Sequence, residues 1–240
     1  MRRFVNLYKE VSGLNIDIKS FPEPGLYLLL PDGERLTLTR EAIEATTRRM
    51  LDDPDCIPKH VRAAADYHPC DICPARFTAE ICHAIMVALP FFDDIDRYMS
   101  YDMVTAVYRE DEEERLVMCH TRMSDALQFV TILSMTEYCE VGSEYGAFFE
   151  GINPLMPVDN IGREVFRNVC ADCGGKIECI RGAIKEMSAN LFHVAQCQTR
   201  RLNLISKRDA FVNAYVTADL IFHFVNSEFR EYTQKFESQV

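Results

Sequence analysis

Apolar and polar positions first form a clear pattern about 25 residues into the chain. Residues 26–30 are apolar, residues 31–33 read Pro-Asp-Gly, and residues 36–40 alternate between apolar and polar side chains. Two short β-type runs joined by a Pro/Gly turn are typical of a hairpin. We therefore expect a β-hairpin over residues 26–39.

A second hairpin is expected near the middle of the chain. The apolar runs at residues 103–107 and 116–118 have strand composition, and a strongly acidic segment at residues 109–115 separates them. We interpret the acidic segment as a solvated loop.

Helical spacing begins between these hairpins. The apolar positions of residues 41–51 fit one face of a helix, which Pro54 breaks. Thr78 has the character of an N-cap for a further helix that ends at Pro90. Cys82 would then lie one turn inside that helix.

The second half of the sequence has a mainly helical pattern. A helix is expected from Ser124 to about Tyr138, with Cys139 just past its end. Beyond Pro157, Asp159 can cap the next helix. The further helical patterns are 159–187, interrupted at Gly174 and Gly175, then about 190–205 and 207–235.

These elements predict an α+β fold with N-terminal β-hairpins and short helices followed by a helical C-terminal half. No internal repeat and no Gly-, Ser- or Pro-rich linker divides the sequence. We expect a single domain over residues 1–240, with mixed hairpins and helices in about 1–122 and helices in 123–240.

Composition narrows the class of protein. With 240 residues, 48% of them hydrophobic, the chain can bury a sizeable core. Its 26 basic and 37 acidic residues give a net charge of −11, which disfavours nucleic acid and anionic membranes as partners. No apolar run is long enough to span a bilayer, and Met1–Asn6 carry no apolar signal core. We expect a cytoplasmic protein.

The chain contains ten cysteines. Reductants keep cytosolic thiols reduced, so thiolate ligands and free thiols are favoured over disulfides. Cys70 and Cys73 have the Cys-x2-Cys spacing that lets two thiolates converge on one tetrahedral ion. Cys82 follows closely, and Cys139 can complete the shell if the fold joins the two segments. The sequence thus predicts a four-cysteine structural zinc site of Cys70, Cys73, Cys82 and Cys139.

Several alternatives to this site stay open. The cysteines can be unlinked buried thiols, since free cysteine is often buried. His68, His83 and Cys119 compete with Cys139 as fourth ligand. An iron–sulfur cluster uses similar ligands, and a thioredoxin-like motif ranks third because the flanking loops lack a βαβ pattern.

A second, weaker cysteine group follows in the helical half. Cys170, Cys173 and Cys179 surround two glycines that permit a tight turn. His193 and Cys197, four residues apart on one helical face, are candidates to complete a metal site with them. The competing interpretation is a helical hairpin turn with incidental cysteines.

The cysteine order also carries a resemblance. The sequence resembles a bacterial family of unknown function with the pattern Cys-Pro-x-Cys-Pro, a third cysteine, Ser-Tyr-Asp and Gly-Cys-Pro. The matching residues are Cys70, Cys73, Pro74, Cys82, Ser100, Tyr101, Asp102 and Cys139, with Phe148 and Phe149 downstream. Asp71, His83, Tyr138 and Glu140 depart from the pattern. The resemblance supports the four-cysteine grouping and implies no reaction.

No catalytic constellation stands out, because the sequence lacks a Gly-x-Ser-x-Gly elbow, a His-Glu-x2-His pair and a Walker loop. We therefore expect a binding or regulatory module more than an enzyme, with an iron–sulfur or thiol-based redox sensor or enzyme as the alternative. One helix is apolar enough for the centre of the domain, or for a homodimer or protein partner: its apolar residues are Ala210, Phe211, Ala214, Tyr215, Ala218, Ile221, Phe222 and Phe224.

Overall fold

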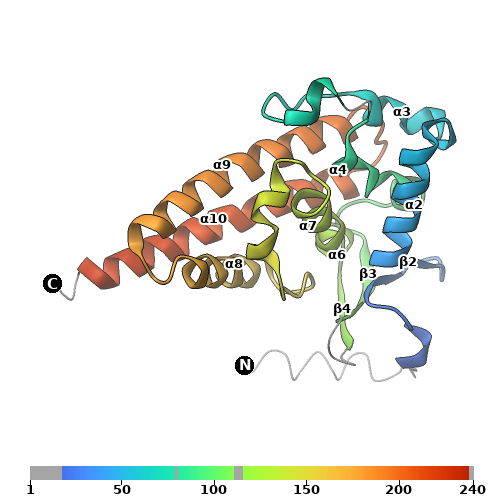
Figure 1. Cartoon of the computed structure of the whole chain (residues 1–240). Helices are drawn as coiled ribbons and strands as arrows, with labels where there is room; N and C mark the ends of the chain where they lie inside the picture. Colours follow the sequence, from blue (N-terminus) through green and yellow to red (C-terminus); the bar gives the residue numbers. More distant parts are fainter. Residues whose placement is uncertain (1–17, 79–80, 111–115, 238–240) are drawn as a thin grey trace.

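The computed structural model describes residues 18–78, 81–110 and 116–237 (Figure 1). The N-terminal residues Met1–Asn6 and most of the predicted acidic loop therefore lie outside the described residues. The fold is α+β, as predicted, with a small sheet on the N-terminal side and a helical C-terminal half.

Both predicted hairpins are confirmed, and they join into one antiparallel sheet. The strands are β1 (Gly25–Leu29), β2 (Arg35–Thr39), β3 (Met103–Arg109) and β4 (Leu116–Arg122), in the order β2-β1-β3-β4. Leu26 pairs with Leu38 in the first hairpin, and all three pairings are antiparallel. Leu26 and Leu28 belong to the main core, whereas Tyr27 faces the opposite side, in a small cluster with Phe21 and Val107.

Short helices connect the two hairpins. Helix α2 (Arg40–Asp52) confirms the predicted helix, and the Thr39 hydroxyl accepts a hydrogen bond from the backbone N–H of Ala42 as its cap. The other segments are η1 (Ile18–Ser20) before the sheet, then η2 (Pro54–Cys56), α3 (Lys59–Asp66), η3 (Pro74–Phe77), α4 (His83–Met86), η4 (Leu89–Phe91) and α5 (Phe92–Ile95).

The predicted helix from Thr78 to Pro90 is wrong in its extent. Cys82 lies before α4 and not inside it, with an extended backbone (φ −81°, ψ 117°). Its N–H donates to the carbonyl of Ala65 at 3.2 Å, so this peptide bonds to the end of α3. The Cys82 N–H therefore bonds to a residue of another helix and not to a residue of its own predicted helix.

The helical half contains α6 (Met123–Ala126), α7 (Gln128–Thr136), η5 (Gly142–Phe149), α8 (Val158–Asp172), α9 (Ile177–Leu202) and α10 (Ala210–Glu237). The predicted break at Gly174 and Gly175 is confirmed, since both have positive φ between α8 and α9. The separation near residue 188 is wrong. Buried positions continue through it from Met187 to Leu191, and α9 runs on without interruption.

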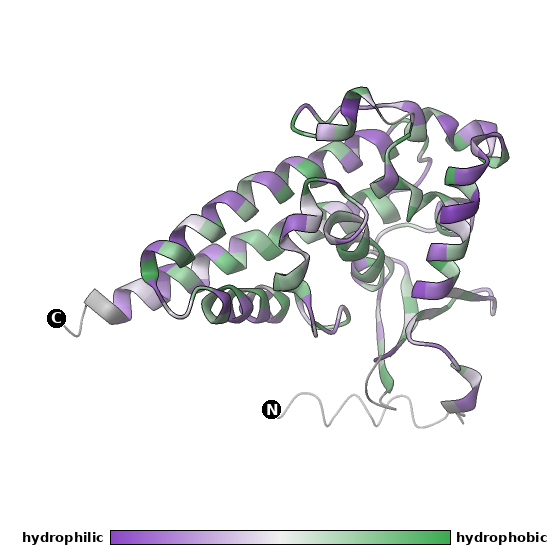
Figure 2. Ribbon diagram, in the orientation of Figure 1, coloured by the Kyte–Doolittle hydropathy of each residue, from purple (hydrophilic) through white to green (hydrophobic). Residues whose placement is uncertain are grey.

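The long helices α9 and α10 lie side by side, with α8 packed across α10 (Figure 1). Both hydrophilic and hydrophobic residues recur along the ribbon of α9, as in an amphipathic helix (Figure 2). Of the apolar residues noted in α10, Phe224 is 38% exposed and the others are buried. The main hydrophobic core contains residues of both halves, from Leu26 to Val225. No helix in residues 18–78, 81–110 and 116–237 has the length and hydropathy to cross a membrane.

Candidate metal centre

Cys70 and Cys73 lie in the loop that follows α3. The backbone N–H of Cys73 donates to the carbonyl of Cys70 at 3.4 Å, and Pro74 begins η3 directly afterwards. Cys70 is buried, and Cys73 is half-buried. The turn therefore directs both thiols inward, as the Cys-x2-Cys spacing led us to expect.

Cys82 is fixed between three helices. Its backbone bonds to the end of α3, its own residue precedes α4, and the side-chain amide of Gln198 from α9 donates to its sulfur at 3.7 Å. Gln198 is itself buried, at 2% exposure.

Cys139 lies past the end of α7, as predicted, and is buried. Its carbonyl accepts from the N–H of Ser143 at 2.9 Å, which closes the turn into η5. The backbone N–H groups of Val141 and Gly142 donate toward its sulfur, but burial dominates and raises the pKa of Cys139 to about 12.

The four predicted cysteines line one common cavity of about 30 Å³. They reach it from three stretches of chain: the loop after α3, the residue before α4 and the end of α7. Gln198 and Arg201 of α9 line it too. An opening of this size accommodates a single ion or one or two water molecules.

A tighter set of possible ligands lies beside this cavity. The donor atoms of Cys70, His193 and Cys197 all lie within 4.8 Å of one another. Among the described residues, no other three possible ligand side chains lie so close together. The group could hold a metal ion. No three of the four predicted sulfurs lie within 4.8 Å of one another, whereas tetrahedral zinc–thiolate bonds place sulfurs about 3.8 Å apart.

The two cysteine thiols of the tighter group interact directly. Cys70 donates a hydrogen bond to Cys197, and this bond together with burial raises the pKa of Cys70. The same bond lowers the pKa of Cys197, and the cations of Arg200 and Arg201 act in the same direction. Ionisation of one of these two thiols therefore makes ionisation of the other less favourable.

Arg201 brings a positive charge into the interior. Its side chain is 1% exposed, and Nη1 donates to the carbonyls of Ala64 at 3.0 Å and Ala65 at 3.5 Å. Within the described part of the chain, its Nε has no hydrogen-bond partner. A buried charge without a counter-charge costs several kcal/mol. The neighbouring sulfurs, if ionised, would supply that counter-charge.

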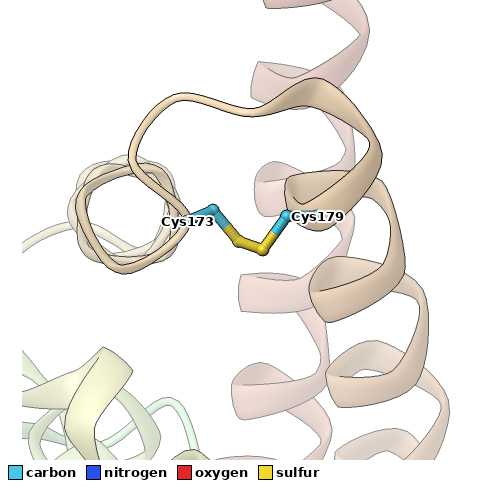
Figure 3. The surroundings of a disulfide bond; sticks show 2 residues. All are labelled: Cys173 and Cys179. Atoms are coloured by element: carbon cyan, nitrogen blue, oxygen red, sulfur yellow. A yellow bond between two sulfur atoms is a disulfide. The ribbon is translucent and has the colours of Figure 1, made fainter.

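The second, weaker group of Cys170, Cys173, Cys179 and Cys197 is not brought together. Cys173 and Cys179 form a disulfide across the turn between α8 and α9 (Figure 3), so neither has a free thiolate to bind a metal. Cys197 lies against Cys70. The expectation that thiols predominate over disulfides needs correction at this pair, which the tight glycine turn holds close enough to join.

The competing ligands are placed as follows. His68 and His83 line the cavity, and His83 Nδ1 lies 3.7 Å from Glu140 Oε1. Cys119 is on β4, where burial raises its pKa to about 11, and it does not line the cavity. The sequence did signal that His193 and Cys197 share a helical face. It did not signal that they meet Cys70, or that Arg201 is buried there.

Comparison with protein-family models, curated proteins and solved structures finds no match to this chain. The resemblance to a bacterial cysteine-motif family therefore stays a prediction.

Proposed function

We propose that this is a metal-binding protein in which Cys70, Cys73, Cys82 and Cys139 hold a structural zinc ion, within a binding or regulatory module. The observation that carries the proposal is the shared small cavity that these four side chains line. Such a closed four-thiolate shell leaves no position for substrate and contributes directly to folding.

The charge around the cavity supports an ion of this kind. Four thiolates and one divalent ion carry two formal negative charges, and the buried guanidinium of Arg201 lies beside them. The buried oxygen Oε1 of Gln198 and nitrogen Nε of Arg201 have no hydrogen-bond partner in the described part of the chain. A buried site that contains thiols, unpartnered polar atoms and a cation is suited to an anionic metal–thiolate complex.

The ion would join three parts of the fold. The loop after α3, the start of α4 and the end of α7 each provide at least one sulfur, and Gln198 links the site to α9. The metal therefore has the role of a cross-link between the N-terminal short helices and the helical half.

The test is metal analysis of the full chain, with cobalt substitution to report thiolate ligation. We expect at least one zinc ion per chain, and loss of the four-thiolate cobalt spectrum in the variants Cys82→Ser and Cys139→Ser. Cys56→Ser is the matched control, because Cys56 is an exposed free thiol that does not line the cavity.

Retention of the four-thiolate cobalt spectrum and of stability in Cys139→Ser would overturn the proposal. Visible absorption accompanied by equal amounts of iron and sulfide would replace zinc with an iron–sulfur cluster. The cavity of about 30 Å³ favours the single ion over such a cluster.

A further inference from the structure

Cys70 belongs to two groups of possible ligands that lie on different sides of it. The cavity of the four cysteines is lined by Gln198 and Arg201 from α9, but neither His193 nor Cys197 is among its lining residues. His193 and Cys197 nevertheless have donor atoms within 4.8 Å of each other and of the Cys70 sulfur. The α9 pair therefore meets Cys70 outside the cavity.

The donor set suits a zinc-type divalent ion. Two thiolates and one imidazole are established zinc ligands, and a three-ligand set leaves the fourth position for water. His193 and Cys197 are one helical turn apart in the middle of α9, so the helix backbone fixes their spacing. Cys197 is fully buried, whereas the His193 side chain is 30% exposed, which opens the site to solvent on the histidine side.

A carboxylate is placed to orient the histidine. His193 Nε2 lies 2.7 Å from Asp71 Oδ1. The contact has ion-pair distance, but this buried nitrogen has no hydrogen-bond partner of good geometry among the described residues. Histidine ligands of metals commonly have a carboxylate beside the ring, which sets its orientation and basicity. Asp71 directly follows Cys70, so the same turn provides both the Cys70 ligand and the carboxylate that orients His193.

A second ion reduces the negative charge of the sulfur cluster. A four-thiolate site with one divalent ion retains two negative charges, which Arg201 alone does not neutralise. A second divalent ion, bound by the additional thiolate of Cys197 and a neutral imidazole, lowers the total to one negative charge. The buried guanidinium of Arg201 opposes that charge, and the Asp71 carboxylate beside His193 adds one more negative charge at the partly exposed side. A thiolate sulfur has more than one lone pair, so Cys70 can bind both ions.

We propose that Cys70, His193 and Cys197 bind a second divalent metal ion, with the Cys70 thiolate bridging it to the four-cysteine ion and water completing its shell. The bridge rests on the proposed function, whereas the three-ligand site does not.

The test is anaerobic titration of the full-length protein with Co²⁺, followed by metal counting. We expect two ions per chain in the wild type. His193→Gln and Cys197→Ser should each retain one ion with the four-thiolate spectrum and weaken the other ion at least about 100-fold. Asp71→Asn, which keeps both sulfurs, should weaken the second ion about 10–100-fold. His60→Gln is the control, because His60 is an exposed histidine paired with Asp93.

The outcomes separate the two proposals. One ion per chain that is unaffected by His193→Gln overturns the second site and leaves the four-cysteine site standing. One ion that His193→Gln weakens and Cys139→Ser does not overturns the four-cysteine site and leaves the three-ligand site. Because His193 is partly exposed, its variant tests the inference even if Cys197→Ser does not fold.

Discussion

Arg201 provides a way to measure the negative charge that the cysteines carry. The side chain is buried and lines the cavity together with Cys70, and its hydrogen bonds go to the backbone carbonyls of Ala64 and Ala65. Its positive charge should therefore oppose folding when the thiols are protonated and favour folding when they are metal-bound thiolates. The substitution Arg201→Met tests both states, because methionine retains much of the side-chain length and removes the charge.

In metal-free protein the substitution has two opposing effects. It removes a buried charge whose desolvation costs several kcal/mol. It also leaves carbonyl groups at the end of α3 without their donor, which costs about 1–3 kcal/mol. We expect these effects to cancel largely, with a change in the free energy of unfolding within about 2 kcal/mol.

In metal-bound protein the substitution also removes an attraction between unit charges. At separations of about 4–8 Å and an effective dielectric constant of about 20, that attraction amounts to about 2–4 kcal/mol for each unit of charge. Each 1.36 kcal/mol corresponds to about a tenfold change in an equilibrium constant. Arg201→Met should therefore weaken metal binding at least about 30-fold.

The assay combines chelator competition for metal affinity with urea unfolding of the metal-free and metal-bound forms. Arg230→Met is the matched control, because Arg230 is exposed on α10 and does not line the cavity, so solvent screens its charge. An equal loss of stability in both forms, with metal affinity within threefold of the wild type, would show that Arg201 contributes packing alone and that the sulfurs carry no charge for it to balance.

Two further predictions concern the frame of the site. Gly142→Ala should destabilise the protein by at least about 1–3 kcal/mol and reduce metal content, because the added Cβ would lie 1.7 Å from the Met135 carbonyl oxygen. The control Gly182→Ala, whose added Cβ has no atom within 4 Å, should stabilise the protein by about 0.5–1 kcal/mol. Equal urea unfolding of the two variants would refute the packing argument. Replacing Cys173 and Cys179 together by serine should cost about 2 kcal/mol, given their sequence separation of 6, and leave metal content unchanged; loss of metal there would restore the second cysteine group as a site.

The sequence predicted correctly those helices and hairpins that depend on residues close together in the chain. The hairpin at residues 26–39 follows from an apolar run and a Pro-Asp-Gly turn, and α2 follows from the apolar spacing of residues 41–51 and the break at Pro54. The end of α7 could be placed in the same way, which put Cys139 just beyond it. These features depend on neighbouring residues, so the sequence displays them directly.

The features that failed depend on residues far apart. Cys82 precedes α4 because its N–H bonds to Ala65 of α3, and no local signal encodes that partner. Arg201 occurs in the polar end of an amphipathic helix, where arginine is normally solvated. Its burial depends on the packing of α3 against α9 (Figure 1). His193 and Cys197 were recognised as a pair, but their true neighbour, Cys70, is more than one hundred residues away.

The loop that carries Cys70 and Cys73 has little regular secondary structure. Between residues 67 and 78 its one regular element is the short η3, and Tyr67, Ile72 and Phe77 are exposed at 42%, 42% and 88%. Ordering the backbone of these twelve residues costs about 12–24 kcal/mol, and exposed apolar side chains return little of it. Structural zinc contributes about 10–16 kcal/mol when it binds its thiolates. Because these magnitudes are comparable, metal ligation at Cys70 and Cys73 can fix a loop that hydrophobic burial does not.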